Sequence, residues 1–168
     1  MDHVVGIGGF AVSGTPGDVV KTFALATCVG IVMYSAGKRV MGMSHIQLPS
    51  SSAMRQGDLP SRFADLGPAH LLMEMQRKGV LKGEIMVSLY GGIGRNGPDD
   101  MFCIGEKNLQ IIRDGFTRMG MRFTNADVGG TDSRTLVAQV STGMVEVIKR
   151  PMARPNLAYS RGTTSRML

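Results

Sequence analysis

The chain has 168 residues, 43% hydrophobic and 19% charged, which is long and apolar enough for one domain with its own core. This composition excludes a disordered chain, and no apolar stretch approaches the roughly 20 residues of a membrane-spanning helix. The first residues lack the basic region and apolar core of a signal peptide, so we expect a cytoplasmic protein without membrane insertion.

The positive charge gathers at one end of the chain. Five of the 19 basic residues and none of the 13 acidic residues lie from Lys149 onward, so the rest of the chain is nearly neutral. We predict one folded domain over residues 1–149 and a basic, disordered tail over residues 150–168. The body has no basic stripe interleaved with aromatic residues, and nucleic-acid binding is therefore not favoured.

Hydrophobic periodicity predicts mostly strands. A first strand interrupted by glycines is expected over residues 4–12, and residues 19–26 alternate so that Thr22 and Leu25 face opposite sides. Further strands are predicted over residues 29–34, 40–48, 84–90, 121–128, 134–140 and 144–148. Helices are predicted over residues 68–78 and 105–119.

The order of these elements predicts the fold class. Strands outnumber helices and often follow one another directly, which differs from strict alternation of strand and helix. We therefore predict an α+β fold, a layered sandwich of mixed, mostly antiparallel β-sheets with two main helices packed outside.

Several common binding motifs are not favoured. Residues 6–11 and 92–97 match the glycine spacing of a dinucleotide-binding loop, but neither motif directly opens a predicted helix, so we interpret them as turn glycines. The three histidines have no ligand spacing and the chain has no CxxC motif, so no metal site is predicted.

The strongest candidate for chemistry is a cysteine and a histidine on neighbouring strands. Cys28 lies where one predicted strand ends and the next begins, and His45 lies in the hairpin partner of that next strand. A thiol and an imidazole that face each other in this way form a nucleophile–base pair, and Thr22 could orient the imidazole through its other nitrogen. On spacing alone, a lone buried cysteine and a satisfied histidine are the more frequent outcome. Cys103 has no histidine placed for it, and both cysteines are expected to be thiols.

Residues 22–32 and 42–49 resemble the CheD family, the bacterial chemoreceptor glutamine deamidases. In that family a threonine, a cysteine six residues later and a histidine seventeen residues beyond form the catalytic set, and Thr22, Cys28 and His45 stand at these intervals. Further similar segments extend the resemblance over about residues 4–149. They are residues 63–65, 91–92, 104–108, 129–130, 134–135 and 142–143. The family usually has Gly-Ser before the cysteine, where this chain has Ala-Thr.

The resemblance implies hydrolysis of glutamine side-chain amides to glutamate on methyl-accepting chemotaxis receptors, through a thioester and without a cofactor. It implies catalytic roles for Cys28, His45 and Thr22, with backbone amides of the nucleophile turn, at Thr27 and Val29, near the oxyanion. It also implies the cytoplasmic helices of chemoreceptors as substrate, possible recruitment to receptor arrays and a CheC-type phosphatase as partner. Residues 50–60 and 93–100 are candidate loops at the rim of the site.

Two other functions stay open at this point. The chain could be mainly a non-catalytic binding or regulatory module for a CheC-type phosphatase or a receptor. It could also be a cysteine amidase or esterase acting on another protein, because neither the residues nor the fold name the substrate.

Overall fold

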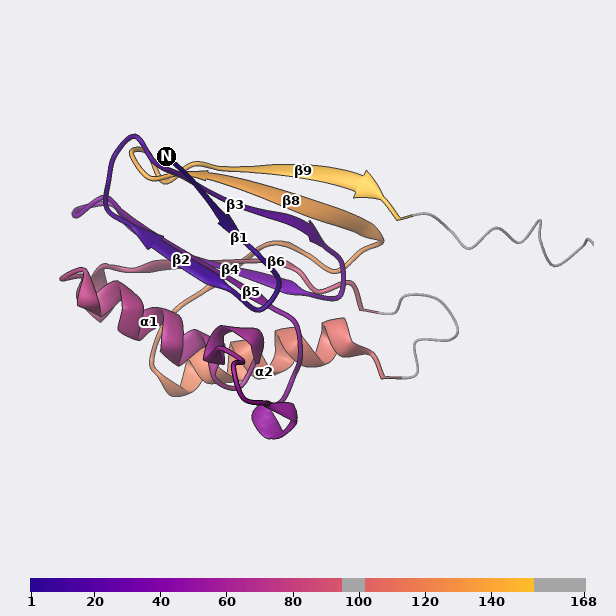
Figure 1. Ribbon diagram of the computed structural model, residues 1–168. Coiled ribbons are helices and arrows are strands. Elements are labelled where there is room, and N and C mark those ends of the chain that lie inside the picture. Colours follow the sequence, from indigo (N-terminus) through magenta and orange to yellow (C-terminus); the bar gives the residue numbers. More distant parts are fainter. Residues whose placement is uncertain (95–101, 153–168) are drawn as a thin grey trace, which may run out of the picture.

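The computed structural model describes residues 1–94 and 102–152 and shows two stacked β-sheets, with both α-helices packed on the outer face of one of them (Figure 1). The helices are α1 (Gly67–Arg77) and α2 (Ile104–Arg118). Three short 3-10 helices lie in the connections: η1 (Ser51–Ala53), η2 (Pro60–Arg62) and η3 (Lys82–Glu84).

The four-stranded sheet has the order β1-β3-β8-β9 and the five-stranded sheet the order β2-β5-β4-β6-β7. The strands of the first are β1 (Asp2–Val5), β3 (Val19–Leu25), β8 (Asp132–Gln139) and β9 (Val145–Pro151). Those of the second are β2 (Phe10–Ser13), β5 (Val40–Ile46), β4 (Val29–Ser35), β6 (Met86–Gly91) and β7 (Thr124–Val128). Within the described residues, β1–β3 and β6–β7 are parallel and the other pairs antiparallel, which confirms the predicted fold class.

The centre of the molecule is the β4–β5 hairpin, in which all residues of both strands are buried. The helices cover one face of the hairpin and the smaller sheet covers the other, so these strands show continuous rather than alternating hydrophobicity. One half of the core lies between the larger sheet and the helices, the other between the two sheets. Because both faces of each strand are buried, periodicity identified the two strands but not which face of each one points to the helices.

Both helices form where the periodicity predicted them. Leu71 and Met75 of α1 and Ile112 and Phe116 of α2 are fully buried against the larger sheet, which is the apolar stripe of an amphipathic helix. Gly79, with a φ of 82°, follows α1 in the left-handed conformation that commonly ends a helix.

Several predicted strands differ from the structure only in their bounds, and three differ in ways that affect the site or the tail. Residues 4–12 form two strands in different sheets, separated by a turn in which the Gly9 amide donates to the Gly6 carbonyl at 2.9 Å. A β-bulge between Thr22 and Leu25, with Ala24 at a φ of 54°, turns both of these side chains inward. At the other end, β9 continues to Pro151, so the first residues of the predicted tail pair with β8. Residues 153–168 of that tail lie outside the described residues.

Candidate functional site

Thr22 and His45 meet in the space between the two sheets. Thr22 points inward from β3 of the smaller sheet and His45 points toward it from β5 of the larger sheet; both are fully buried. Thr22 Oγ1 lies 2.7 Å from His45 Nδ1. The sequence suggests that Thr22 could orient the imidazole, and the structure brings the two residues together across the sandwich.

The hydrogen bonds of Thr22 define the tautomer of His45. Thr22 Oγ1 donates its proton to the Val5 carbonyl at 2.8 Å. A hydroxyl has one proton, so the same oxygen must accept from His45 Nδ1–H. The neutral ring therefore carries its lone pair on Nε2, which is buried and has no hydrogen-bond partner among the described residues. A lone pair held in this way is what a general base requires.

Cys28 begins the crossing from the smaller to the larger sheet and lies on the same side of the larger sheet as His45. Its side chain is half-buried and packs on the core between the sheets. The register pairs Val29 with Ile46 and Gly30 with His45, so Cys28 is a diagonal neighbour of His45. Gly30 contributes no side chain between them.

The predicted contact between thiol and imidazole is not formed in this structure, because His45 Nε2 makes no hydrogen bond to Cys28. Burial raises the pKa of the Cys28 thiol to about 11 and lowers the pKa of His45 to about 4. Both groups are thus neutral at pH 7.

The two residues that flank Cys28, Thr27 and Val29, differ in the partners of their backbone hydrogen bonds. The amide and carbonyl of His45 bond to Gly9 and Gly8, on the side away from β4. By the alternation of an antiparallel ladder, the backbone groups of Val29 face Ile46 and belong to the sheet. Thr27 precedes β4, and its carbonyl accepts from the Asn108 side chain at 3.2 Å. Of the two predicted oxyanion donors, the Val29 amide is therefore already part of the β4–β5 ladder.

Two glycines at the end of β6, Gly91 and Gly92, lie against the carbonyl of Cys28. The Gly92 amide donates to it at 2.9 Å, and Gly91, at a φ of 89°, approaches so closely that a Cβ atom there would lie 2.4 Å from this oxygen. The Gly-Gly pair belongs to the segments that resemble the family, and the resemblance implies no role for it. A glycine pair directly after a strand was the available signal for close backbone approach.

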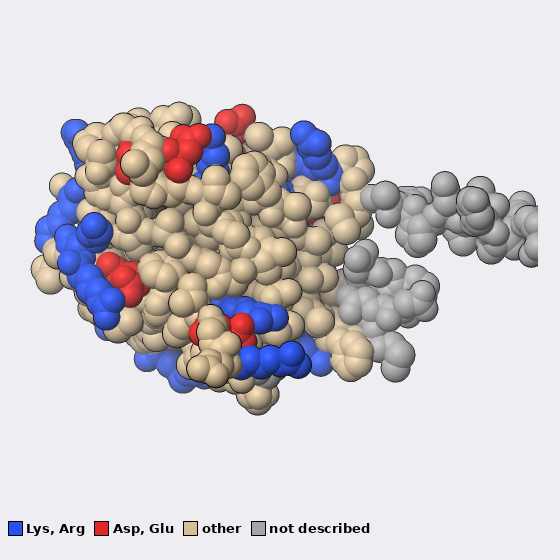
Figure 2. Space-filling model, viewed as in Figure 1, with Lys and Arg blue, Asp and Glu red and all other residues tan. Residues whose placement is uncertain are grey.

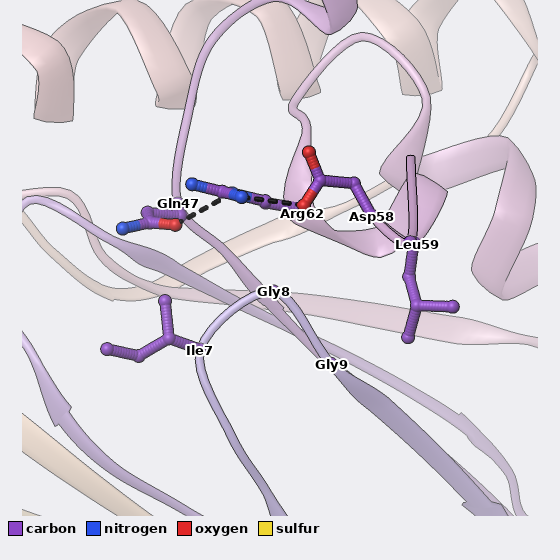
Figure 3. A pocket seen from close by; sticks show the side chains of 8 residues that line it. Ile7, Gly8, Gly9, Gln47, Asp58, Leu59 and Arg62 are labelled. Carbon is purple, nitrogen blue, oxygen red and sulfur yellow. Dashed lines mark hydrogen bonds and ion pairs between the residues drawn. The ribbon is translucent and has the colours of Figure 1, made fainter. Parts of the chain in front are cut away.

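A pocket of about 390 Å³ adjoins the end of β5 (Figure 3). The turn at Gly8 and Gly9 lines one side, and Asp58, Leu59 and Arg62 line the other. The Arg62 guanidinium lies between the Gln47 amide and the Asp58 carboxylate, at 2.9 and 2.7 Å. Part of the predicted rim loop 50–60 thus borders a hollow next to the strand of His45. Of the other predicted rim loop, residues 95–100 lie outside the described residues.

The described residues contain no group of three His, Cys, Asp or Glu side chains that could hold a metal ion. In the view of Figure 2, basic side chains lie in separate groups near the edge, several beside acidic ones, and the centre over the strands is uncharged. No helix in the described ranges is both long and apolar enough to span a membrane.

Comparison with known proteins gives consistent matches. Residues 47–149 match a family model described as CheD chemotactic sensory transduction. A probable chemoreceptor glutamine deamidase CheD from Syntrophotalea carbinolica is 38% identical over 150 residues, covering 87% of this chain and 93% of that protein. A protein of the same description from Thermococcus kodakarensis is 32% identical over 151 residues, covering 89% and 93%.

The family model begins after Thr22, Cys28 and His45. The matches to the two relatives cover so much of the chain that they extend over Cys28 and His45. Among solved structures, the Bacillus licheniformis hypothetical protein YfiH matches with a TM-score of 0.44 and 15% identity, over 72% of this chain and 50% of that one. With the family model over more than half of its length and two relatives over nearly all of it, the chain belongs to the CheD family.

Proposed function

We propose that this protein hydrolyses glutamine side-chain amides of chemoreceptors to glutamate, with Cys28 as nucleophile, His45 as general base and acid, and Thr22 as the residue that orients His45. The observation that carries the proposal is the hydrogen bond between Thr22 and His45, which leaves Nε2 unpaired on the face that Cys28 shares. The substrate class follows from the description of the relatives as chemoreceptor glutamine deamidases.

The reaction begins from a neutral pair. His45 Nε2 takes the thiol proton of Cys28 as Sγ attacks the amide carbon, which converts the carbonyl oxygen into an oxyanion. The imidazolium then donates this proton to the leaving nitrogen, and the C–N bond breaks to release ammonia. His45 next removes a proton from water, which attacks the thioester, and the imidazolium returns that proton to sulfur. The net reaction consumes one water and yields glutamate and ammonia.

The neutral resting state has a physical reason. A buried thiolate would lack the solvation that water provides, which is why burial raises the pKa of Cys28. Ionisation of the thiol is therefore coupled to attack on a substrate already in the site. We assign stabilisation of the oxyanion to backbone amides at the Cys28 turn, first that of Thr27; in other hydrolases such a donor contributes about 3–4 kcal/mol.

The proposal also concerns location and partners. The cytoplasmic helices of receptors are the expected substrate, so the protein would act in the cytoplasm at receptor arrays. A helix is a suitable occupant for an open hollow bordered by exposed apolar side chains, and Ile7 and Leu59 border the pocket beside β5. A CheC-type phosphatase that uses the same surface would compete with the receptor.

The test is incubation with a receptor cytoplasmic fragment, followed by peptide mass spectrometry for the conversion of glutamine to glutamate. We expect conversion by the wild type and by Cys103→Ser, and none by Cys28→Ala. Equal conversion by Cys28→Ala would exclude the assigned nucleophile. Binding without conversion by any variant would favour a regulatory module, and equal turnover of unrelated glutamine-containing helices would favour a general amidase.

A further inference from the structure

The β4–β5 ladder includes His45 but ends one residue short of Cys28. Cys28 precedes the first residue of β4, and the chain beyond His45 leaves β5 after Ile46. At this frayed end of the hairpin, Gln47 is the residue that continues the register opposite Cys28. Beyond the last ladder pair, Val29 and Ile46, a link outside the ladder can fix the separation of the two segments.

Asn108 of α2 provides such a link. Its side chain is fully buried, and its Nδ2 donates to the Thr27 carbonyl at 3.2 Å and to the Gln47 carbonyl at 3.1 Å. Thr27 immediately precedes Cys28, and Gln47 lies two residues after His45. One amide nitrogen with two protons thus joins the nucleophile turn to the end of the strand that carries the base.

The helix that presents Asn108 is itself held close to this turn. At Gly105, a Cβ atom would lie 1.9 Å from the Ile93 carbonyl oxygen, so only glycine permits this approach of α2. The Ile93 amide in turn donates to the Ala26 carbonyl at 2.8 Å. Residue 26 is therefore bonded to the segment that packs against the start of α2, and residue 27 is bonded to α2 itself.

Burial of the Asn108 side chain also has an energetic cost that an apolar side chain would avoid. Its Oδ1 is buried and has no hydrogen-bond partner among the described residues. A buried acceptor without a partner is unfavourable, and its presence in a native structure calls for an explanation. The explanation consistent with the contacts is that the position needs both amide protons, and that the unpaired oxygen accompanies them.

We propose that Asn108 is a positioning residue for deamidation, which holds the Thr27–Cys28 turn at the separation from His45 that proton transfer requires. This inference rests on the proposed function, since it assumes that Cys28 and His45 are the reacting pair. A residue of α2, which lies outside the sandwich, thus sets the distance between Cys28 and His45. The effect should appear in the chemical step and not in substrate binding.

The experiment compares Asn108→Leu, which removes both donors at similar volume, with Tyr34→Phe as a matched control. Tyr34 is also buried and donates one hydrogen bond to a backbone carbonyl, that of Val140 at 3.0 Å, but at the opposite end of β4. We expect similar decreases in melting temperature for both variants. Only Asn108→Leu should lose kcat, by about 10- to 100-fold, with KM changed less than about threefold.

A second readout needs no substrate. The rate of Cys28 alkylation by iodoacetamide, followed by peptide mass spectrometry from pH 6 to 10, reports on the ionisation and access of the thiol. We expect Asn108→Leu to change this profile at least about threefold and Tyr34→Phe to leave it unchanged. Should Asn108→Leu not fold, Asn108→Ser keeps one donor and takes its place, with the same direction of effect.

The outcomes separate the two proposals. If a folded Asn108 variant matches Tyr34→Phe in kcat and in alkylation profile, Asn108 has only a structural role and the inference is overturned. If Cys28→Ala retains full activity, the proposed nucleophile is wrong, whatever the Asn108 variants do. If no protein converts the substrate, the alkylation profiles alone decide whether Asn108 positions the thiol.

Discussion

Thr22 and His45 lie in different sheets, and the 2.7 Å contact between Oγ1 and Nδ1 joins the two layers of the sandwich. The contact defines the His45 tautomer because the Thr22 proton is already donated to the Val5 carbonyl. One buried hydroxyl therefore decides which ring nitrogen can act as a base.

Replacing Thr22 by Val should remove this control while preserving the shape of the side chain. We expect kcat to fall about 10- to 100-fold and the free energy of unfolding to decrease by about 1–3 kcal/mol, because Nδ1–H loses its buried acceptor. Thr22→Ser keeps the hydroxyl and should retain most of the activity. Steady-state kinetics and the ¹⁵N shifts of the ring test this; an unchanged tautomer and kcat in Thr22→Val would contradict it.

Stability should depend on His45 below neutral pH. Burial lowers the pKa of His45 to about 4 from an ordinary value near 6.5, so between these values the unfolded chain binds the proton and the folded one does not. The contribution is complete above pH 6.5 and is lost as the pH falls toward 4, up to about 3 kcal/mol.

The check is urea unfolding from pH 7 to pH 3 for the wild type and for His45→Gln. The variant should lose less stability between pH 6.5 and pH 4 than the wild type does. Hydrogen bonds from Ser13 and His3 hold the pKa of Asp18 well below its usual range, and stability that depends on this carboxylate should disappear below about pH 4 in both proteins. Parallel curves over the whole range would show that His45 is not buried in its neutral form.

The reactivity of Cys28 should follow its raised pKa. With a pKa of about 11, the thiolate fraction increases about tenfold for each pH unit from 7 to 10. Alkylation of the Cys28 peptide, separated from that of Cys103 by mass spectrometry, should rise in the same proportion without levelling off. A plateau near pH 7 would instead reveal a stable thiolate–imidazolium pair in the resting protein.

Gly91 should be intolerant of a side chain. Gly91→Ala would place a Cβ atom 2.4 Å from the Cys28 carbonyl oxygen in addition to straining a positive φ, whereas Gly79, at a φ of 82°, has open space around it. We expect Gly79→Ala to cost about 1 kcal/mol and Gly91→Ala at least about 2 kcal/mol more.

Unfolding in urea measures both glycine variants, and deamidation kinetics provide the second comparison. Only Gly91→Ala should lower kcat, because relief of the clash displaces the backbone of Cys28. Equal costs for the two substitutions would mean that this carbonyl can move without consequence.

The local sequence by itself determined the secondary structure and the candidates for chemistry. Periodicity identified both helices and the β4–β5 hairpin, because each presents a regular apolar pattern over several residues. Spacing and resemblance singled out Thr22, Cys28 and His45. The pattern predicts a single strand over residues 4–12, where the structure has two. The reason is that the pattern reports which residues are apolar and not which strand they pair with.

Only the tertiary structure decided how these residues meet. Strict alternation predicts that Thr22 and Leu25 face opposite sides of the strand, whereas the bulge turns both side chains inward. The sheet to which β3 belongs depends on its pairing with β8, which is distant in the sequence. Asn108 lies more than 60 residues from the nearer of the two carbonyls it joins, so no local pattern could have paired them. The pKa values of Cys28 and His45 depend on desolvation by burial, which exists only once the two sheets are packed together.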